Sequence, residues 1–359
     1  MFEQAGKKSF FLTRSWFANF ERTVVRQNEQ VLIYTVESVA PGGRPMAILP
    51  LKLSHKNGGV FSPWIMGSLS NYYSCYFEPI IAPDADNVPK ILACLALALW
   101  EDRKQWDMLD LKTLPAESPL FPLLAKALSS QGLMAQRYYC FGNRHLDVGG
   151  RSYAEYFQGL PTVLRKNIPY MVRKIQKTHC IRMDICTNEA NLDASLAVYE
   201  KLYLARWKQG EPFSEFITGL ITKSAQNGTL RLGMLFVDDE PAAVQLWFVD
   251  EGIASIYKTA YDPRFSNLSV GNVLTAHLMR HVIDLDKVKE VDYLSGDDSY
   301  KKDWMPSRRE RWGIMAFNPL SFKGLVLAIR HIGGRHLKDF LVPTSHRSLG
   351  SHTPPRLGK

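Results

Sequence analysis

Cysteine is scarce in this sequence, and the cysteines that do occur are scattered. There are five among 359 residues, with no Cys-x-x-Cys pair and no histidine at metal-ligand spacing beside them. An odd number at such spacings argues against a disulfide framework or a zinc site. Buried thiols in a reducing compartment are therefore expected at the five positions, which are Cys75, Cys94, Cys140, Cys180 and Cys186.

Long hydrophobic runs are missing as well. The longest, ILACLALALW at residues 91–100, falls far short of the roughly 20 residues that cross a bilayer. The first residues also lack the apolar stretch of a secretion signal. Because 46% of the residues are hydrophobic and 22% are charged, the chain is expected to be globular and cytoplasmic.

The short motifs of several enzyme classes are absent too. The sequence has no GxSxG nucleophile turn, Walker loop, HExxH zinc motif or dinucleotide-binding glycine pattern. Its nine histidines show no metal-ligand spacing. Chemistry that depends on these motifs is therefore disfavoured, and no metal is expected.

Positive charge, by contrast, is in excess. The formal net charge of +9 favours anionic partners such as phosphorylated cofactors, nucleic acid or a lipid surface. One basic segment has no acid between Glu155 and Asp184, and Pro169 is expected to break or kink any helix there. A clamp for phosphates and a solvated helix face are two open interpretations of this segment. Its basic residues are Arg165, Lys166, Arg173, Lys174, Lys177 and Arg182.

The end of the chain forms a second basic segment. From Arg330 to Lys359 there are six lysines and arginines against a single acid, Asp339. A docking helix followed by disorder is the simplest interpretation. Weak contact with an anionic membrane surface is the other, which would place the protein peripherally at the inner membrane.

The order of predicted elements occurs twice along the chain. Hydrophobic periodicity predicts a hairpin, a strand, a helix, a strand, a helix and a strand before residue 150, and a similar order with a longer preface after it. The predicted fold is therefore α/β with mixed sheets, in two related domains at 1–150 and 151–325, followed by a tail at 326–359. The first half is predicted to contain strands at 29–54 (a hairpin), 59–67, 106–114 and 134–142, with helices at 88–100 and 118–132. The second half is predicted to contain strands at 181–187, 231–250 (a hairpin), 253–262, 289–296 and 311–319, with helices at 191–210, 212–228 and 271–285.

A phosphate site is indicated where the strand at 253–262 leads into the helix at 271–285. Ser269, Gly271 and Asn272 stand at the helix start, where free N–H groups and the helix dipole favour an anion. Arg264 lies in the same loop. An ordinary serine-led helix cap is the alternative.

The stretch GDDSYKKDW at 296–304 crowds ionisable side chains just after a predicted strand. Acyl transfer to an amine needs a base, donors for the developing oxyanion and a proton for the leaving group. Asp297 is the candidate base, Tyr300 the acid or orienting group, and Lys301 the anion-stabilising group. A surface turn is the alternative, with Trp304 more often a packing residue than a substrate platform.

Four stretches carry a resemblance to a known family. They are YKTAYDPRFSNLSVGNVL at 257–274, VDYLSGDDSYKKDW at 291–304, the basic segment at 164–174 and ARWKQG at 205–210. The second half resembles the GNAT acyltransferase fold. The whole chain, over roughly residues 10 to 320, looks like the tandem-GNAT proteins, which include Fem-type aminoacyl transferases and acyltransferase-like proteins linked to cellulose and exopolysaccharide synthesis.

The resemblance implies two tandem GNAT-like domains, the second with the acyl-donor site and the first shaping the acceptor groove. The donor's thioester would lie where the strands at 253–262 and 289–296 part. Lys258 would join the catalytic residues named above. The implied substrate-binding residues are Asn71, Tyr72, Tyr73, Arg165, Tyr261 and Trp304.

The implied function is N-acyl transfer from acyl-CoA or acyl carrier protein to an amino group of a sugar, an amino acid or a cell-envelope precursor. The sequence lacks the Q/R-x-x-G-x-G/A pattern of simple GNAT enzymes. Two alternatives therefore stay open. One is an aminoacyl-tRNA-dependent transferase whose basic segment binds RNA, and the other is a non-catalytic partner in envelope polysaccharide synthesis.

Overall fold

The computed structural model describes residues 1 to 333, except residues 7, 40–41 and 56–61. The elements of the first half are α1 (Phe2–Gly6), α2 (Arg14–Val24), β1 (Glu29–Glu37), β2 (Pro45–His55), β3 (Trp64–Ser68), β4 (Ile80–Ile81), α3 (Val88–Glu101), β5 (Met108–Pro115), α4 (Leu120–Ser130) and β6 (Met134–Asp147). Those that follow are α5 (Tyr153–Gln158), α6 (Thr162–Thr178), β7 (Ile181–Cys186), α7 (Leu192–Trp207), α8 (Ser214–Gln226), β8 (Leu230–Val237), β9 (Glu240–Asp250), β10 (Ile253–Tyr261), α9 (Val270–Asp284), β11 (Glu290–Asp292), α10 (Ser299–Trp304), β12 (Ser307–Phe317) and α11 (Phe322–Ala328).

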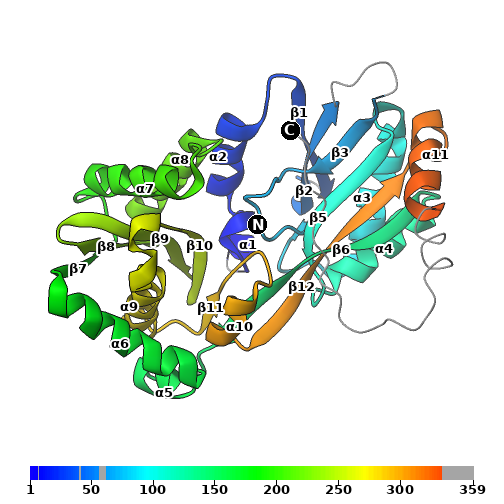
Figure 1. Ribbon diagram of the computed structural model, residues 1–359. Helices are drawn as coiled ribbons and strands as arrows, with labels where there is room; N and C mark the ends of the chain where they lie inside the picture. Colours follow the sequence, from blue (N-terminus) through cyan, green and yellow to red (C-terminus); the bar gives the residue numbers. More distant parts are fainter. Residues whose placement is uncertain (7, 40–41, 56–61, 334–359) are drawn as a thin grey trace, which may run out of the picture.

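The described strands form one twelve-stranded sheet that runs through both halves of the molecule (Figure 1). Its order is β1-β2-β3-β5-β12-β6-β11-β10-β9-β8-β7, with β4 paired to β2. Both predicted hairpins are confirmed, since β1 pairs with β2 and β8 with β9, each antiparallel. The mixed α/β class predicted from the sequence is therefore confirmed.

The last strand lies among the strands of the first half. β12 follows the second half in sequence, yet it pairs antiparallel with β5 on one side and with β6 on the other. The last three residues of β6 pair in turn with β11. The chain therefore returns to complete the first half. The domain limits at residues 150 and 325 stay a prediction, and they divide a continuous sheet.

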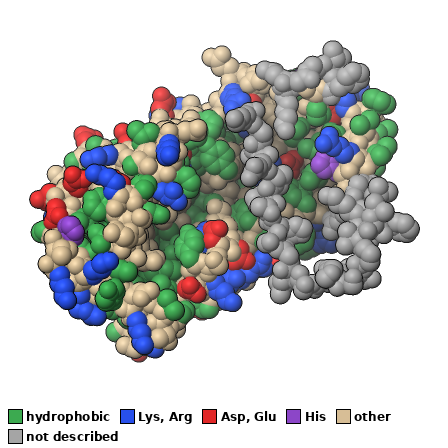
Figure 2. Space-filling view, in the orientation of Figure 1, with side chains coloured by type: hydrophobic (Ala, Val, Ile, Leu, Met, Phe, Trp, Pro, Cys, Tyr) green, Lys and Arg blue, Asp and Glu red, His purple; other side chains and the backbone are tan. Residues whose placement is uncertain are grey.

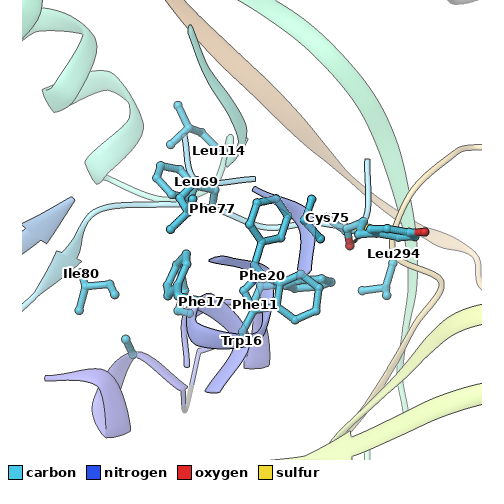
Figure 3. Packing of buried hydrophobic residues seen from close by; sticks show 14 of the residues in the cluster. Phe11, Trp16, Phe17, Phe20, Leu69, Cys75, Phe77, Ile80, Leu114 and Leu294 are labelled. Carbon is cyan, nitrogen blue, oxygen red and sulfur yellow. Dashed lines mark hydrogen bonds between the residues drawn. The ribbon is translucent and has the colours of Figure 1, made fainter. Parts of the chain in front are cut away.

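A hydrophobic core joins the two halves on one face of the sheet. Trp16 and Phe20 of α2 are buried and meet the ring of Phe216 on α8 edge-on, at centroid separations of 5.1 and 5.9 Å. Cys75 and Leu294, which come from distant parts of the chain, lie beside this aromatic group (Figure 3). The N-terminal helix thus packs on the second half, which fixes the loop around Cys75 against it.

The expectation that Pro169 breaks its helix is wrong. α6 runs without interruption from Thr162 to Thr178 with Pro169 inside it. Proline in a helix interior costs about 3 kcal/mol through its missing N–H and its clash with the preceding turn. The apolar side chains of Leu164, Ile168 and Ile175 are buried in the core that contains α9, and this packing outweighs the local penalty.

No helix in the described part of the chain is both long and apolar enough to cross a membrane. Of the predicted tail at 326–359, the structure describes the end of α11 and a short π-helix at Ile329–Gly333. The expectations for residues 334–359 lie outside the described residues.

The close contact between β12 and β6 gives a first prediction. A Cβ built on Gly313 would lie 2.2 Å from the ring of Tyr138, whose hydroxyl is held by Asp110 at 2.5 Å. Gly313→Ala should therefore lower the free energy of unfolding by about 1–3 kcal/mol, the usual effect of overpacking. Urea unfolding measures this change. Gly210→Ala is the control, because nothing lies within 4 Å of a Cβ there, and equal stability of the two variants would contradict the packing argument.

Candidate active site

The strands β10 and β11 part after a short paired stretch. They pair in parallel only from Ile253–Ser255 to Glu290–Asp292, whereas β10 continues to Tyr261. Beyond Asp292 the chain turns away, with Leu294 in a left-handed conformation at φ +58°. The expected opening between these two strands is therefore present.

A β-bulge decides which side chains of β10 face the first half. The pairing with β9 shifts between Ile256 and Lys258, so Tyr257 is the extra residue. As a result, two consecutive side chains point to the same face. Tyr257 packs on Phe10 and donates its hydroxyl to the carbonyl of Tyr73 at 3.2 Å, and Lys258 lies over the Tyr73 ring.

A carboxylate and a lysine form the centre of this face. Glu211, in the loop between α7 and α8, accepts two hydrogen bonds of 2.8 Å from Lys258, one at each oxygen. The hydroxyls of Tyr73 and Tyr199 also donate to Glu211. The Lys258 ammonium lies 4.6 Å from the ring centre of Tyr73 and 5.0 Å from that of Tyr203. The side chains of Glu211 and Lys258 are only 6% and 16% exposed.

Glu211, Lys258, Tyr73, Tyr199 and Tyr203 are called the Glu211 cluster below. Burial and hydrogen bonding shift the pKa values of its side chains. Burial and the bond to Glu211 raise the pKa of Tyr73 well above 10. Burial lowers the pKa of Lys258 below its ordinary 10.5, while the hydrogen bonds and charge of Glu211 act in the opposite direction. Tyr73 and Lys258 are thus two proton donors held by one carboxylate.

The start of α9 lies beyond the end of β10. Asp262 accepts a hydrogen bond from the N–H of Arg264 and pairs with its guanidinium, which also reaches Glu240 at 2.9 Å. Ser269 has φ +51° and makes no side-chain cap. The first N–H groups of α9 therefore lack a serine cap. Among the described residues outside the helix's own backbone, a ring carbon of Tyr261 lies nearest to a Cβ built on Gly271, at 4.0 Å.

Asp297 is tied to two arginines. It pairs with Arg144 at 2.5 Å and with Arg308 at 2.6 Å. Partial burial alone would raise the pKa of Asp297, but the hydrogen bonds and charges of Arg308 and Arg144 lower it below the ordinary 3.8. A carboxylate held in this way is a weak base. Its assignment as the general base stays a prediction.

The other residues of this loop are anchored by packing and by backbone contacts. Lys301 is buried, bonds the carbonyl of Ser295 at 2.5 Å and has its pKa lowered by burial. Tyr300 is half exposed and meets the ring of Tyr293 edge-on at 6.0 Å. Trp304 is fully buried in the core under α9, a position that suits a packing residue.

An ion-pair network joins the paired residues of β11 to β6 and β12. Arg309 bonds Asp292 at 2.5 Å and Asn143 at 2.6 Å, and Asn143 also bonds Asp292. Arg311 bonds Glu117 at 2.8 Å. These side chains line a cavity of about 310 Å³. No residue of the Glu211 cluster lines it, so this cavity belongs to the junction network.

A polar groove lies on the first-half side of the Glu211 cluster. Its volume is about 590 Å³, and Asn71, Tyr72 and Phe213 form one wall. The paired side chains of Lys52 and Glu29, 2.8 Å apart, form another. Tyr72 is exposed, and its ring centre lies 4.5 Å from that of Tyr73. The groove therefore adjoins the cluster through two neighbouring tyrosines.

Arg165 lies on the opposite face of the sheet from this cluster. Side chains of β9 alternate between the two cores: Val244 packs with the core that contains α7 and α8, whereas Trp247 packs with the one that contains α9. α6 contacts α9, and Arg165 bonds the carbonyl of Gln158 at 2.9 Å. Of the residues predicted from sequence, Lys258 and Tyr73 are therefore brought together, and Arg165 is not.

The sequence prediction did not include Glu211, Tyr199 or Tyr203. The stretch ARWKQG, which carried part of the family resemblance, ends at Gly210, immediately before Glu211. This neighbouring motif was the one sequence signal that pointed toward the loop of Glu211. Among the described residues, no group of three or more His, Cys, Asp or Glu side chains is arranged to hold a metal ion.

Comparison with known proteins gives a family match for the second half of the chain. Residues 163–302 match the family described as acetyltransferase (GNAT) domain. The comparison with curated proteins found no match. The match confirms that the chain carries an acyltransferase domain of the GNAT type.

Three solved structures share the fold over most of the chain. FemX has a TM-score of 0.54 at 9% identity, covering 84% of this chain and 90% of its own. A conserved protein of unknown function from Bacteroides thetaiotaomicron has 0.53 at 8%, covering 85% and 90%. L-PGS from Bacillus licheniformis has 0.50 at 11%, covering 92% and 96%. Together with the domain match, they confirm the expected tandem-GNAT, Fem-like fold.

The two arginines on Asp297 give the second prediction. Because its pKa is lowered in the folded protein, the carboxylate stabilises the fold above the ordinary pKa of 3.8, and this contribution is lost as the pH falls through the lowered value. Asp297→Asn should lower the free energy of unfolding at neutral pH by about 1 kcal/mol, since solvent still reaches the pair. The difference from the parent should shrink as the pH is taken from neutral to acid values below the lowered pKa of Asp297.

Urea unfolding at the two pH values measures this effect. Asp303→Asn is the control, because Asp303 is exposed and forms no ion pair with any described residue. Unchanged stability combined with a turnover loss of about 10²-fold would instead support Asp297 as the general base.

Proposed function

From the premise that residues 163–302 form a GNAT acetyltransferase domain within a Fem-like fold, we propose that the protein is an N-acyltransferase. It transfers an acyl group from a thioester donor, acyl-CoA or acyl carrier protein, to an amino group. The acceptor is an amino sugar, an amino acid or a cell-envelope or polysaccharide precursor. The observation that carries the proposal is the Glu211–Lys258 pair with Tyr73 beside the parted strands β10 and β11.

The Glu211 cluster supplies what the transfer step requires. The acceptor amine attacks the thioester carbonyl, a C–N bond forms, and the C–S bond breaks. The Lys258 ammonium stabilises the oxyanion that develops on the carbonyl oxygen. The Tyr73 hydroxyl, whose raised pKa keeps it protonated, donates a proton to the departing thiolate, and the resulting tyrosinate takes up the proton that the acylated nitrogen loses, so Tyr73 ends as it began. Glu211 orients both donors.

The donor's phosphates are proposed to lie at the start of α9. The first turn of α9, which contains Gly271 and Asn272, has no side-chain cap from Ser269 and presents a positive helix end there. Tyr261, at the end of β10, lies beside Gly271, and β10 leads back from there to the bulge at Lys258. An extended thioester arm lying along β10 would therefore place its carbonyl beside the lysine.

The acceptor is proposed to occupy the polar groove beside Tyr72. An exposed tyrosine ring offers a flat apolar face, and the amide of Asn71 together with the Lys52–Glu29 pair offers donors and acceptors. This combination suits a sugar-like ligand with many hydroxyl groups. Because Tyr72 adjoins Tyr73, an amino group bound in the groove can reach the Glu211 cluster.

The third prediction tests the lysine. Lys258→Met removes the ammonium while keeping a chain of similar length, so turnover should fall by about 10²-fold or more. Lys223→Met is the control, because Lys223 is exposed on α8 away from the Glu211 cluster. Steady-state kinetics and thermal melting are measured together.

A donor screen has to come first, with acyl-CoA, acyl carrier protein and aminoacyl-tRNA each offered to the intact protein. If Lys258→Met turns over as fast as the Lys223→Met control while remaining folded, the cluster has no part in catalysis. Turnover with aminoacyl-tRNA alone, falling steeply with salt, would favour the RNA-dependent alternative.

The fourth prediction tests the donor site. Gly271→Glu places a negative charge where the donor's phosphates are proposed to bind, so donor affinity should fall roughly tenfold or more. The added Cβ would be in ordinary van der Waals contact with the ring of Tyr261 at 4.0 Å, so the melting temperature should stay near that of the parent. Gly271→Ala fits the same space without charge and should keep most of the affinity. Equal donor affinity of the two variants would remove the α9 start from the donor site.

A further inference from the structure

Helix α6 has two opposite arcs of different character. Leu164, Ile168 and Ile175 are buried in the core with α9, and Met171 and Val172 pack against the same core. At 100° per residue these five side chains fall within one arc of about 100°. The whole helix is thus held on the body of the protein by one side.

The opposite arc is exposed, and basic residues dominate it. Its members fall within another arc of about 100°, centred away from the apolar one. Tyr170 is 54% exposed and Val163 is 69% exposed, although both are large and apolar for a surface position. Figure 2 shows lysine and arginine side chains along the lower left of the molecule, where α6 lies in Figure 1. The six residues of this basic arc are Val163, Lys166, Tyr170, Arg173, Lys174 and Lys177.

The charge of the basic arc is not compensated by neighbouring acids. In the part of the chain that the structure describes, none of its four cations lies within 4.0 Å of a carboxylate. Arg182, just past the helix, differs because it pairs with Asp184. Since no acid occurs between Glu155 and Asp184 in the sequence, no local partner exists for the arc. A surface of this kind is complementary to a polyanion.

We propose that the basic arc of α6 docks the protein on a membrane surface that contains anionic lipids. The other side of α6 is packed on the body of the protein, so the basic arc is the side of the helix that is exposed to solvent. Its side chains follow the length of the helix, and a flat surface can therefore contact all of them at once. From Val163 to Lys177 the arc is about 21 Å long at 1.5 Å per residue. It can therefore contact several lipid headgroups at once.

The composition of the arc also suits lipid. Three of its four cations are lysines, whose compact charge responds to the diffuse negative field of a lipid surface and does not need the bidentate geometry that arginine offers to phosphate. Tyr170 stands between the cations and Val163 precedes them, and exposed aromatic and apolar side chains gain from contact with the headgroup region. A nucleic acid is the other polyanion to test.

Docking through α6 leaves the proposed reaction site accessible. α6 packs on the α9 face of the sheet, whereas Glu211 and Lys258 lie on the face that carries α7 and α8. The Glu211 cluster would therefore face away from the bilayer. The docking proposal rests on the basic arc alone and stands independently of the acyltransferase chemistry.

The fifth prediction is measured by co-sedimentation of the full chain with vesicles. The protein should bind phosphatidylcholine vesicles that contain about a third phosphatidylglycerol and should not bind pure phosphatidylcholine, and added salt should weaken the binding. Each lysine or arginine near such a surface is worth about fivefold in partitioning. Arg173→Gln combined with Lys177→Gln should thus weaken binding about 25-fold.

Matched variants distinguish an effect of the basic arc from an effect of the protein's net charge. Lys126→Gln combined with Lys223→Gln makes the same change in net charge at two exposed lysines elsewhere, and it should bind vesicles nearly as the parent does. Lys166→Gln combined with Lys174→Gln is a second arc variant, which should weaken binding like the first. Thermal melting confirms that each variant is folded.

Three results would overturn the proposal. One is equal vesicle binding by parent and both arc variants, which would move the contact elsewhere on the chain. Another is equal binding to neutral and anionic vesicles. The third is a fall in affinity for a mixed transfer-RNA probe, measured by filter binding, that exceeds the fall for vesicles, because the arc would then be a nucleic-acid surface.

Discussion

The insertion of β12 between β5 and β6 is the constraint on which the rest of the structure depends. It makes one sheet out of two halves, because β6 pairs with β12 along most of its length and with β11 at its end. The relative position of β10 and the first-half loop at 71–77 is thereby fixed, and the core around Trp16 closes over it. Tyr73 can reach Glu211 only because the halves are joined in this way.

A buried ion pair such as Glu211–Lys258 is weak evidence for stability, since the cost of removing two charges from water offsets most of their attraction. Here the pair sits at a bulge, beside strands that part, and three tyrosines surround it. The bulge itself interrupts regular pairing. A buried ion pair that adds little stability, at an irregular position of a strand, is better explained by a role in catalysis than by a role in folding. The proposed mechanism starts from this pair for that reason.

The sequence predicted elements well and long-range neighbours poorly. Alternation and turn residues located both hairpins, because those signals are local. Pro169 was misjudged because packing on α9 outweighs a local preference, and the face on which Lys258 lies depends on a bulge that breaks the period of two. Glu211 lies in a loop with no motif of its own, and only the fold brings it to β10.

The same insertion explains the position of Asp297 in the charged stretch at 296–304. β12 begins with SRRER at 307–311, and each arginine finds its acid on another element: Arg308 on Asp297, Arg309 on Asp292 and Arg311 on Glu117. A catalytic carboxylate and a cross-strand partner look alike in sequence, since both are acids after a strand. The side chain that pairs with the carboxylate distinguishes the two cases. For Asp297 that side chain is Arg308, and the pairing becomes known only from the position of β12 beside β6. Asp297 is therefore interpreted first as a residue that holds the last strand in place, and the search for the reacting groups moves to the opposite side of the opening, where Lys258 faces the first half.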